Sequence, residues 1–365
     1  MISRTIGLVS TNYKQEELRA LADDRMVSTI PFGGRYRLVD FVLSNMVNSG
    51  ITSVGLISHF NYRSLIEHVG SGKHWGLAKK DGGLFILPGS VYSARSKDAR
   101  FLVRDLKSNL NFVKREDCDY IIVSDGSTVM NIDFTKFIQF HEDSGYPLTL
   151  LCKDMPERKD GKFVVEENGR VVKMVGAGMG STSRYINCFI INKDYFLECL
   201  ELFALLDYAD FMEIVQDRIP NLKINSYNYD GFVGIIENIQ DYVEVSRKLM
   251  DRSVRDDLFN GPRRIMTRVT DQTPTIYKPG AKVVNSLVSA GCIIEGTVEN
   301  SIISRNTYIG KGAVVKNSIV MHRGNIQDGA SVDHVICDTY VSIGKNVHVE
   351  GSEEKPLIFG KNSDI

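Results

Sequence analysis

Hydrophobic and polar residues follow two different rhythms along the chain. Up to about residue 250, short apolar runs alternate with segments whose apolar residues lie three or four positions apart. This pattern predicts buried strands at 5–9, 53–58 and 120–124, and helices at 39–49, 61–69 and 101–115. Alternating strands and helices indicate a mainly parallel sheet covered by helices on both faces. Ligands of such sheets bind beyond the carboxyl ends of the strands, so a site is expected after Leu8 and at 125–127.

From Ile276 onward, apolar residues recur every six positions, and small or polar residues fill the intervals. The interval is kept by Ile309, Val315 and Met321, by Ile326 and Val332, and by Ile343 and Val349. A six-residue period is typical of a left-handed parallel β-helix, in which each face of a triangular coil points one apolar residue inward. A β-sandwich is the alternative, but its strands would alternate with a period of two.

Residues 251–275 lack both rhythms. They contain Gly261, Pro262 and Pro274 among several charged residues, which predicts a linker. The 365 residues suffice for two domains with a large core. We therefore expect an α/β domain over 1–250, a linker over 251–275 and a β-helix over 276–365.

Composition narrows the classes of function. The formal net charge is −1, so no overall field attracts nucleic acid or a membrane surface. The start MISRTIGLVS is unlike a signal peptide and no apolar run approaches ~18 residues, which favours a cytoplasmic location. The six cysteines form neither a CxxC pair nor a His/Cys cluster, so we expect buried thiols and no zinc site.

Two segments resemble a known enzyme family. Residues 31–51 read PFGGRYRLVDFVLSNMVNSGI, and residues 285–304 read NSLVSAGCIIEGTVENSIIS. Both are similar to bacterial glucose-1-phosphate adenylyltransferases (ADP-glucose pyrophosphorylases), and the resemblance extends from Ile6 to about Val349. Within that family the chain looks most like the GlgD-type companion subunits of two-gene glycogen systems. The resemblance implies a nucleotidyltransferase-like, Rossmann-like domain followed by the β-helix.

Active members of this family bind the triphosphate of ATP on a glycine-rich loop. No glycine lies between positions 7 and 33 of this chain. Counted back from Pro31 without gaps, the loop's glycines fall on Asn12, Tyr13 and Gln15, and its catalytic arginine falls on Glu17. An acidic residue at that place would repel the triphosphate. Residues 15–25 instead predict a short amphipathic helix.

The other parts of the family's reaction centre are changed as well. The two aspartates that hold Mg²⁺ in the family align with Ser127 and Ile235, and the lysine of its sugar-phosphate pocket aligns with Ala177. Ser127 is a poor Mg²⁺ ligand compared with a carboxylate, and Ile235 cannot coordinate a cation. Asp125 and Glu237 lie nearby as weak substitutes. We therefore expect no metal or other cofactor, with Mg²⁺ relevant only if a rearranged site operates.

What remains of the signature segment is suited to binding anions. Glycines allow a ligand to approach the backbone closely, and arginines offer planar, positively charged guanidinium groups with several N–H donors. The candidates for substrate or effector binding are Gly33, Gly34, Arg35, Arg37, Arg25, Lys73 and His74. The resemblance implies that a phosphate or sugar-phosphate effector would bind near this segment, between the two domains. The alternative is a tight turn at the two glycines, with the arginines paired to local carboxylates.

Three functional hypotheses follow. The first is a non-catalytic or weakly catalytic regulatory subunit, which assembles with a catalytic ADP-glucose pyrophosphorylase subunit as a homo- or hetero-oligomer. The second is an active glucose-1-phosphate adenylyltransferase with a rearranged site that uses Asp125, Glu237 and Arg35. The third is a hexapeptide-repeat acyltransferase, which would need a catalytic histidine among His322, His334 and His348.

Overall fold

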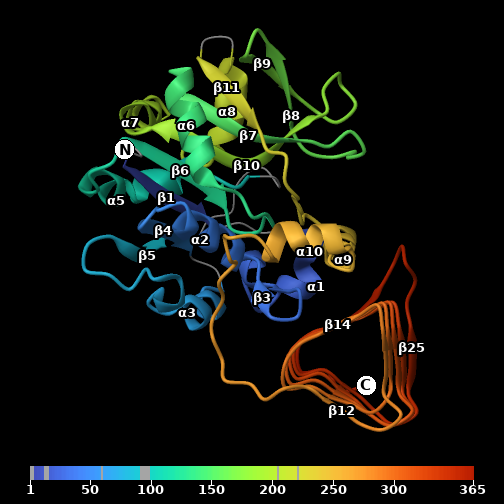
Figure 1. Cartoon of the computed structure of the whole chain (residues 1–365). Helices are drawn as coiled ribbons and strands as arrows, with labels where there is room; N and C mark the ends of the chain where they lie inside the picture. Colours follow the sequence, from blue (N-terminus) through green and yellow to red (C-terminus); the bar gives the residue numbers. More distant parts are fainter. Residues whose placement is uncertain (1–3, 12–15, 59–60, 91–98, 204, 220–221) are drawn as a thin grey trace.

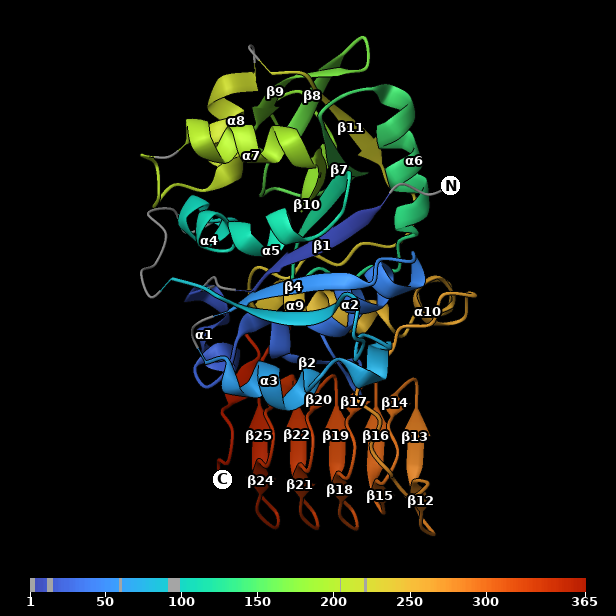
Figure 2. The same ribbon diagram turned by 90° about the vertical axis from the view of Figure 1, so that its left-hand side faces the viewer.

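The N-terminal part of the chain forms a nine-stranded sheet with helices on both faces (Figures 1 and 2). The computed structural model describes residues 4–11, 16–58, 61–90, 99–203, 205–219 and 222–365. The main path of the sheet has the order β11-β7-β10-β6-β1-β4-β5, and β8 and β9 form a hairpin beside β10. The strands are β1 (Thr5–Ser10), β4 (Ser53–Ser58), β5 (Gly83–Pro88), β6 (Tyr120–Asp125), β7 (Leu148–Asp154), β8 (Phe163–Glu167), β9 (Arg170–Val175), β10 (Ser183–Asn192) and β11 (Ile224–Asn228).

The three strands predicted from apolar runs are confirmed as β1, β4 and β6, which pair in parallel. Strand β5 extends this parallel set, but β10 runs antiparallel to both of its neighbours, β6 and β7. Because β10 is reversed, its first residue, Ser183, pairs with Asp154 at the end of β7. The reversal therefore brings residues of β10 to the edge of the sheet at which the sequence predicts a site.

Each face of the sheet is covered by its own set of helices. One apolar core includes residues of α4 (Val103–Ser108), α5 (Leu110–Arg115), α7 (Lys193–Leu202) and α8 (Phe211–Arg218). The other core includes residues of α2 (Val39–Asn48), α3 (Arg63–Val69) and α6 (Phe134–Ser144). The single helix predicted over 101–115 is two helices, since the Asn109 side chain donates to the Asp105 and Pro88 carbonyls and interrupts the helical ladder.

The C-terminal part is the predicted parallel β-helix, with the triangular cross-section seen in Figure 1. The inward-facing residues Ile294, Ile309, Ile326 and Ile343 stack in register and are fully buried, as the six-residue period predicts. The first sheet contains β12 (Ile276–Tyr277), β15 (Ile293–Ile294), β18 (Tyr308–Ile309), β21 (Asn325–Ile326) and β24 (Ser342–Ile343). The second contains β13 (Lys282–Val284), β16 (Thr297–Glu299), β19 (Val314–Lys316), β22 (Ser331–Asp333) and β25 (His348–Glu350). The third contains β14 (Leu287–Val288), β17 (Ile302–Ile303), β20 (Ile319–Val320), β23 (Val335–Cys337) and β26 (Leu357–Phe359).

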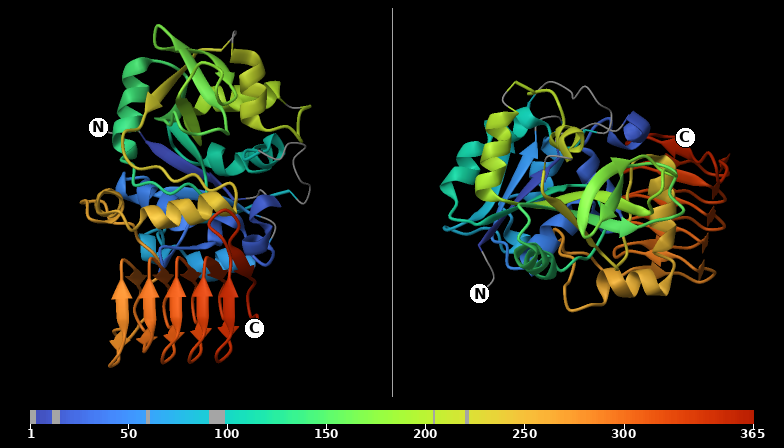
Figure 3. Two further views of the ribbon diagram at one scale, coloured as in Figure 1. Left: turned by 90° about the vertical axis from the view of Figure 1, so that its right-hand side faces the viewer. Right: turned by 90° about the horizontal axis from the view of Figure 1, so that it is seen from above.

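The third sheet of the β-helix packs against the α/β part through an outward-facing apolar row (Figures 2 and 3). This junction row consists of Leu287, Ile302, Ile319, Ile336 and Ile358, which lie in register on successive strands. It shares one apolar core with Tyr242, Val245 and Leu249 of the α9 region (α9 is Ile239–Lys248). The two parts are therefore joined by a continuous core.

The segment expected to be a linker is only partly irregular. It begins with a helix, α10 (Arg252–Phe259), because the Asp251 side chain caps its N-terminus and Leu258 is buried. The glycine and prolines that predict a linker start only at Gly261. Among the described residues, no helix combines the length and the apolar composition needed to cross a membrane.

Candidate functional site

The residues aligned with the family's phosphate loop are only partly described. Asn12, Tyr13 and Gln15 lie outside the described residues. Glu17 belongs to a short 3-10 turn, Glu16–Leu18, and is exposed. The following helix, α1 (Arg19–Ala22), continues a segment in which Leu18 and Leu21 are buried in the junction core. The described part of this segment is therefore helical and packs between the two parts of the chain, as the amphipathic pattern predicts.

The weak metal candidate, Asp125, is buried at the end of β6. It is 2% exposed, and its carboxylate accepts hydrogen bonds from the Thr128 hydroxyl (2.9 Å) and from the Thr128 amide (3.2 Å). Burial raises the pKa of Asp125, a shift opposed by the nearby charge of Arg100. Ser127 is 4% exposed and its hydroxyl donates to Asp125 at 3.3 Å. The carboxylate is thus satisfied by its own loop.

The other two positions at which the family's site residues are replaced, Ile235 and Ala177, belong to the apolar core and to a turn. Ile235 is 5% exposed and packs in the apolar core beside Val233. Its neighbour Gly234 forms a bridge with Val129. Ala177 lies in the glycine-rich turn between β9 and β10 and is half-buried. None of these residues offers a charged group to a ligand.

At the edge where β10 begins, an arginine is held by two carboxylates. Arg184 on β10 is 2% exposed, so its charge is almost removed from water. Its Nη2 donates to Oε2 of Glu237 at 2.8 Å, and its Nη1 lies 3.3 Å from Oδ1 of Asp160. Glu237, the predicted substitute for a metal ligand, therefore binds a guanidinium group. A buried charge needs such partners, because desolvation otherwise costs several kcal/mol per ion.

Two further arginines extend this contact into a network. Arg158 donates to Asp241 at 2.7 Å and to Asp160 at 2.9 Å, and Arg100 lies 3.8 Å from Glu237. We call the six residues the arginine–carboxylate network: Arg100, Arg158, Arg184, Asp160, Glu237 and Asp241. No sequence motif predicts the network, because its members lie on segments separated by up to about 140 positions.

The carboxylates of the network satisfy the geometry of a metal site but not its chemistry. Oxygen atoms of Asp160, Glu237 and Asp241 lie within 4.8 Å of one another. A magnesium ion would need these oxygens free of competing cations. Each carboxylate instead contacts Arg158 or Arg184. The residues present therefore do not fit Mg²⁺, and guanidinium groups neutralise the acids.

The two signature glycines form a turn that faces the β-helix. They connect β2 (Pro31–Phe32) to β3 (Tyr36–Arg37), and their φ angles are +57° at Gly33 and +78° at Gly34. A Cβ atom at Gly34 would lie 2.5 Å from the Ser289 hydroxyl oxygen. The absence of side chains at these glycines therefore lets the backbone approach the β-helix. This observation supports the tight-turn alternative.

The arginine candidates lie at the junction between the two parts. Arg25 is 8% exposed and pairs with Asp338 of the β-helix at 2.7 Å. Arg37 donates to the Ser64 carbonyl at 2.8 Å, and burial and the charge of Arg25 lower the pKa of Arg37 to about 10. Arg35 is exposed and lies over the Tyr36 ring. Arg25 therefore pairs with a carboxylate that is distant in the sequence, whereas the tight-turn alternative expects local carboxylates. Asp40, which accepts from the Arg37 amide at 2.9 Å, is such a local carboxylate.

Further cations of the β-helix join these arginines. Burial and the charge of Arg35 lower the pKa of Arg305, while burial and the charges of Arg323, Arg305 and Arg37 lower the pKa of His322. We call these six cations at the junction the junction cation cluster: Arg25, Arg35, Arg37, Arg305, His322 and Arg323. The last three were missed as effector candidates because they lie far along the chain from the signature segment.

Lys73 and His74 belong to a neighbouring surface. Both lie in the 3-10 turn Lys73–Trp75, where Lys73 is exposed and Nδ1 of His74 accepts from the Val269 amide at 3.5 Å. Among the described contacts, none links Lys73 to the junction cation cluster. Of the residues predicted to bind an anion, Arg25, Arg35 and Arg37 therefore lie together at the junction, and Lys73 and His74 lie beside it.

The three histidines considered for acyl transfer lie apart and have different surroundings. Nδ1 of His322 donates to the Arg305 carbonyl at 3.1 Å. Nδ1 of His334 lies 2.7 Å from Asp333, and His348 is exposed at the start of β25. All six cysteines are buried free thiols, as the sequence predicts.

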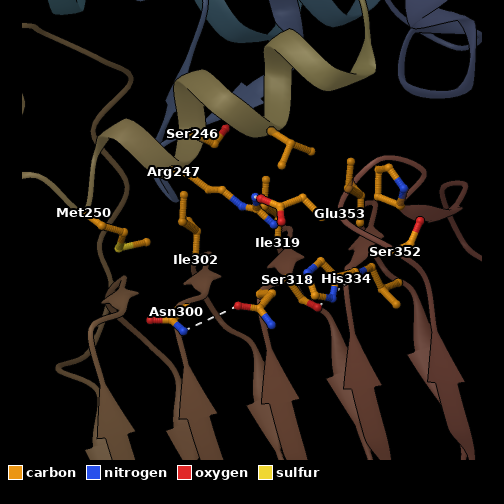
Figure 4. A pocket seen from close by; sticks show the side chains of 15 residues that line it. Ser246, Arg247, Met250, Asn300, Ile302, Ser318, Ile319, His334, Ser352 and Glu353 are labelled. Carbon is orange, nitrogen blue, oxygen red and sulfur yellow. Dashed lines mark hydrogen bonds and ion pairs between the residues drawn. The ribbon is translucent and has the colours of Figure 1, made fainter.

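A small pocket lies between α9 and the third sheet of the β-helix (Figure 4). Its floor includes Ile302 and Ile319 of the junction row, and His334 lies at its side. Arg247 of α9 and Glu353 of the 351–356 loop point toward each other at its mouth and pair at 2.6 Å. The pocket is thus closed by an ion pair across the seam between the two parts.

Comparison with known proteins agrees with this architecture. A nucleotidyl transferase family model matches residues 15–188, and a GlmU-like C-terminal hexapeptide model matches residues 275–355. The glycogen biosynthesis protein GlgD of Bacillus subtilis is 30% identical over 98% of this chain and 96% of its own length. The chain belongs to the GlgD-type members of the glucose-1-phosphate adenylyltransferase family.

GlgD proteins and glucose-1-phosphate adenylyltransferases both align with most of the chain. The GlgD of Geobacillus stearothermophilus is 33% identical over 86% of this chain and 84% of its own length. The glucose-1-phosphate adenylyltransferase of the same organism is 27% identical over 87% of this chain and 84% of its own length. The predicted family and the predicted two-part fold are therefore confirmed.

Proposed function

We propose that this chain is a non-catalytic or weakly catalytic regulatory subunit of ADP-glucose pyrophosphorylase in cytoplasmic glycogen biosynthesis. The proposal depends mainly on the arginine–carboxylate network. This network lies at the edge of the sheet where a substrate would bind. There the Glu237 carboxylate is paired with Arg184, and the Asp125 carboxylate accepts hydrogen bonds from its own loop. The names of the GlgD relatives, which are glycogen biosynthesis proteins, support the pathway.

The same geometry argues against a rearranged active site. Such a site would have to bring Asp125, Glu237 and Arg35 together around one substrate. Arg35 belongs to the junction cation cluster, and the other two residues are engaged elsewhere. Loss of a single transition-state donor typically costs ~10²–10³ in rate. Loss of the arginine, both metal carboxylates and the lysine leaves little of the family's reaction.

The open end of the β-helix supports association with a catalytic subunit. In the described chain, β12, β13 and β14 each pair with one strand only, so their outer edges are unpaired. Ile276, Tyr277 and Val284 on these strands are 53%, 55% and 47% exposed. At the opposite end, residues 363–365 bond to β24 and cover it. An exposed strand edge with apolar side chains is suited to pairing with another chain.

The experiment is to mix the purified chain with the catalytic glucose-1-phosphate adenylyltransferase of its own organism. Light scattering after gel filtration should detect a complex that contains both chains. The rate of ADP-glucose formation or its response to phosphorylated effectors should change when the complex forms, since a subunit acts by shifting conformational populations. Absence of both a complex and a kinetic change would refute the proposal.

A second proposed role is binding of a phosphate or sugar-phosphate effector at the junction cation cluster. Positive groups from both parts of the chain gather there. Burial and the neighbouring arginines lower the pKa values of Arg37 and Arg305, while the charge of Asp40 opposes both shifts. An anion would relieve the repulsion between these positive groups. Calorimetric titration with inorganic phosphate should detect binding that Arg37→Gln weakens at least about tenfold, since a charge-assisted hydrogen bond contributes about 1.5–3 kcal/mol. Equal binding by the variant would place the anion elsewhere.

A further inference from the structure

One arginine of the junction cation cluster already has an anionic ligand from the other part of the chain. Nη2 of Arg25 donates to both carboxylate oxygens of Asp338, at 2.9 and 2.7 Å. Asp338 is 2% exposed and directly follows β23 of the β-helix. Thr339 holds its Oδ1, through the backbone amide at 2.5 Å and the hydroxyl at 3.0 Å. The β-helix thus presents a fixed carboxylate to the α/β part.

This carboxylate is the main counter-charge of Arg25. The neighbouring Asp40 is engaged by His68 at 2.5 Å and by the Arg37 amide at 2.9 Å. Without Asp338, Arg25 would be a buried cation beside Arg37, whose own charge is partly offset by Asp40. A phosphate dianion carries the charge and the acceptor oxygens that would replace the carboxylate there.

We propose that Asp338 is an internal anion that competes with an external phosphate group for Arg25. Binding of a phosphorylated ligand in the junction cation cluster then displaces Asp338 and releases one of the ties between the β-helix and the α/β part. The inference rests on the second proposed role, effector binding in this cluster, and adds the device by which the ligand would act. The junction row keeps the two parts together while the tie is open.

The first test is thermal unfolding of Asp338→Asn in chloride and in phosphate buffers of equal ionic strength. In chloride the midpoint should fall by at least about 5 °C, because Arg25 loses its partner in a buried site. Phosphate should raise the midpoint of this variant more than that of the wild type. Asp328→Asn, which removes a half-exposed carboxylate of the same β-helix, is the control and should show neither effect. An equal phosphate response of wild type and Asp338→Asn would overturn the proposal.

A second test uses the wild-type chain and does not depend on the folding of Asp338→Asn. Saturating phosphate should increase amide hydrogen exchange at residues 338–341, because displacement of Asp338 frees the turn that it anchors. The double variant Arg25→Met with Asp338→Leu replaces the pair by apolar groups and should show no such increase. Unchanged exchange in the wild type at saturating phosphate would contradict the competition.

The two proposals fail in different ways. Phosphate could bind the wild type without increasing amide hydrogen exchange at residues 338–341 and without raising the unfolding midpoint of Asp338→Asn more than that of the wild type. In that case effector binding stands and the competition is wrong. If calorimetry detects no phosphate binding to either the wild type or Asp338→Asn, both are wrong.

Discussion

At the scale of single residues, the acidic groups at the edge of the sheet where a substrate would bind make internal contacts. Asp125 is bound by Thr128, and Glu237 is bound by Arg184. Substitution of such a group should therefore be detected, if at all, in the stability of this chain, whereas substitution of a metal ligand would abolish a reaction.

Asp125→Asn should leave stability at neutral pH equal or higher. Burial raises the pKa of Asp125 above its unfolded value, so the folded chain binds this proton more tightly than the unfolded chain. Its contribution to stability consequently falls as the pH rises from the unfolded pKa through the folded pKa. Asparagine keeps an acceptor for Thr128 and removes the charge. Urea unfolding between about pH 4 and pH 7 checks this, and a large loss of stability at neutral pH would contradict it.

Glu237→Gln should destabilise the fold by about 2–4 kcal/mol, because it leaves the charge of Arg184 with a single acidic partner in a buried site. Urea unfolding at neutral pH provides the measurement. The matched control is Glu353→Gln, which breaks an exposed pair with Arg247 and should cost less than about 1 kcal/mol. Equal effects of the two substitutions would mean that the arginine–carboxylate network contributes no more than a surface pair.

At the scale of secondary-structure elements, α9 connects the arginine–carboxylate network to the β-helix. Asp241 near its N-terminus pairs with Arg158, and the other side of the helix shares the apolar core of the junction row. Tyr242 also donates to the Pro31 carbonyl at 2.7 Å, which ties α9 to the glycine turn. The helix therefore contacts three regions that the sequence separates widely.

Ile319→Ala should cost about 2–4 kcal/mol, since it removes a side chain that is 7% exposed from the centre of the junction row. Val314→Ala is the control, because Val314 lies on the second sheet and is only half-buried. Chemical denaturation followed by circular dichroism should separate the two variants. A similar, small effect of both would show that the junction row contributes little to stability.

The elements also show how far the sequence can predict this structure. Apolar runs identified β1, β4 and β6, and the six-residue period identified the β-helix, because both patterns are local. The reversed strand β10 has no local mark, since an apolar run does not encode its direction. The linker prediction missed α10, whose buried Leu258 finds its partners only in the folded chain. The arginine–carboxylate network could not be predicted, because it depends on which distant segments meet.

At the scale of the whole molecule, the exposed strand edges leave one end of the β-helix available for a partner. Ile276→Glu should abolish assembly with the catalytic subunit while leaving the unfolding midpoint of the isolated chain nearly unchanged, because Ile276 is exposed there. Ile365→Glu at the opposite end, where the residue is 42% exposed, is the control. Gel filtration of the mixtures distinguishes them, and assembly of both variants would place the interface elsewhere.

We propose above that this member of the family has no working reaction centre of its own. The most direct test is ADP-glucose formation by the purified chain alone, with ATP, Mg²⁺ and glucose-1-phosphate, beside the catalytic subunit at equal concentration. We expect product at or close to the level of the blank, because the described carboxylates at this edge of the sheet are bound by Thr128, Arg184 and Arg158 rather than free for Mg²⁺. Turnover comparable to that of the catalytic subunit would show that the chain has a working reaction centre.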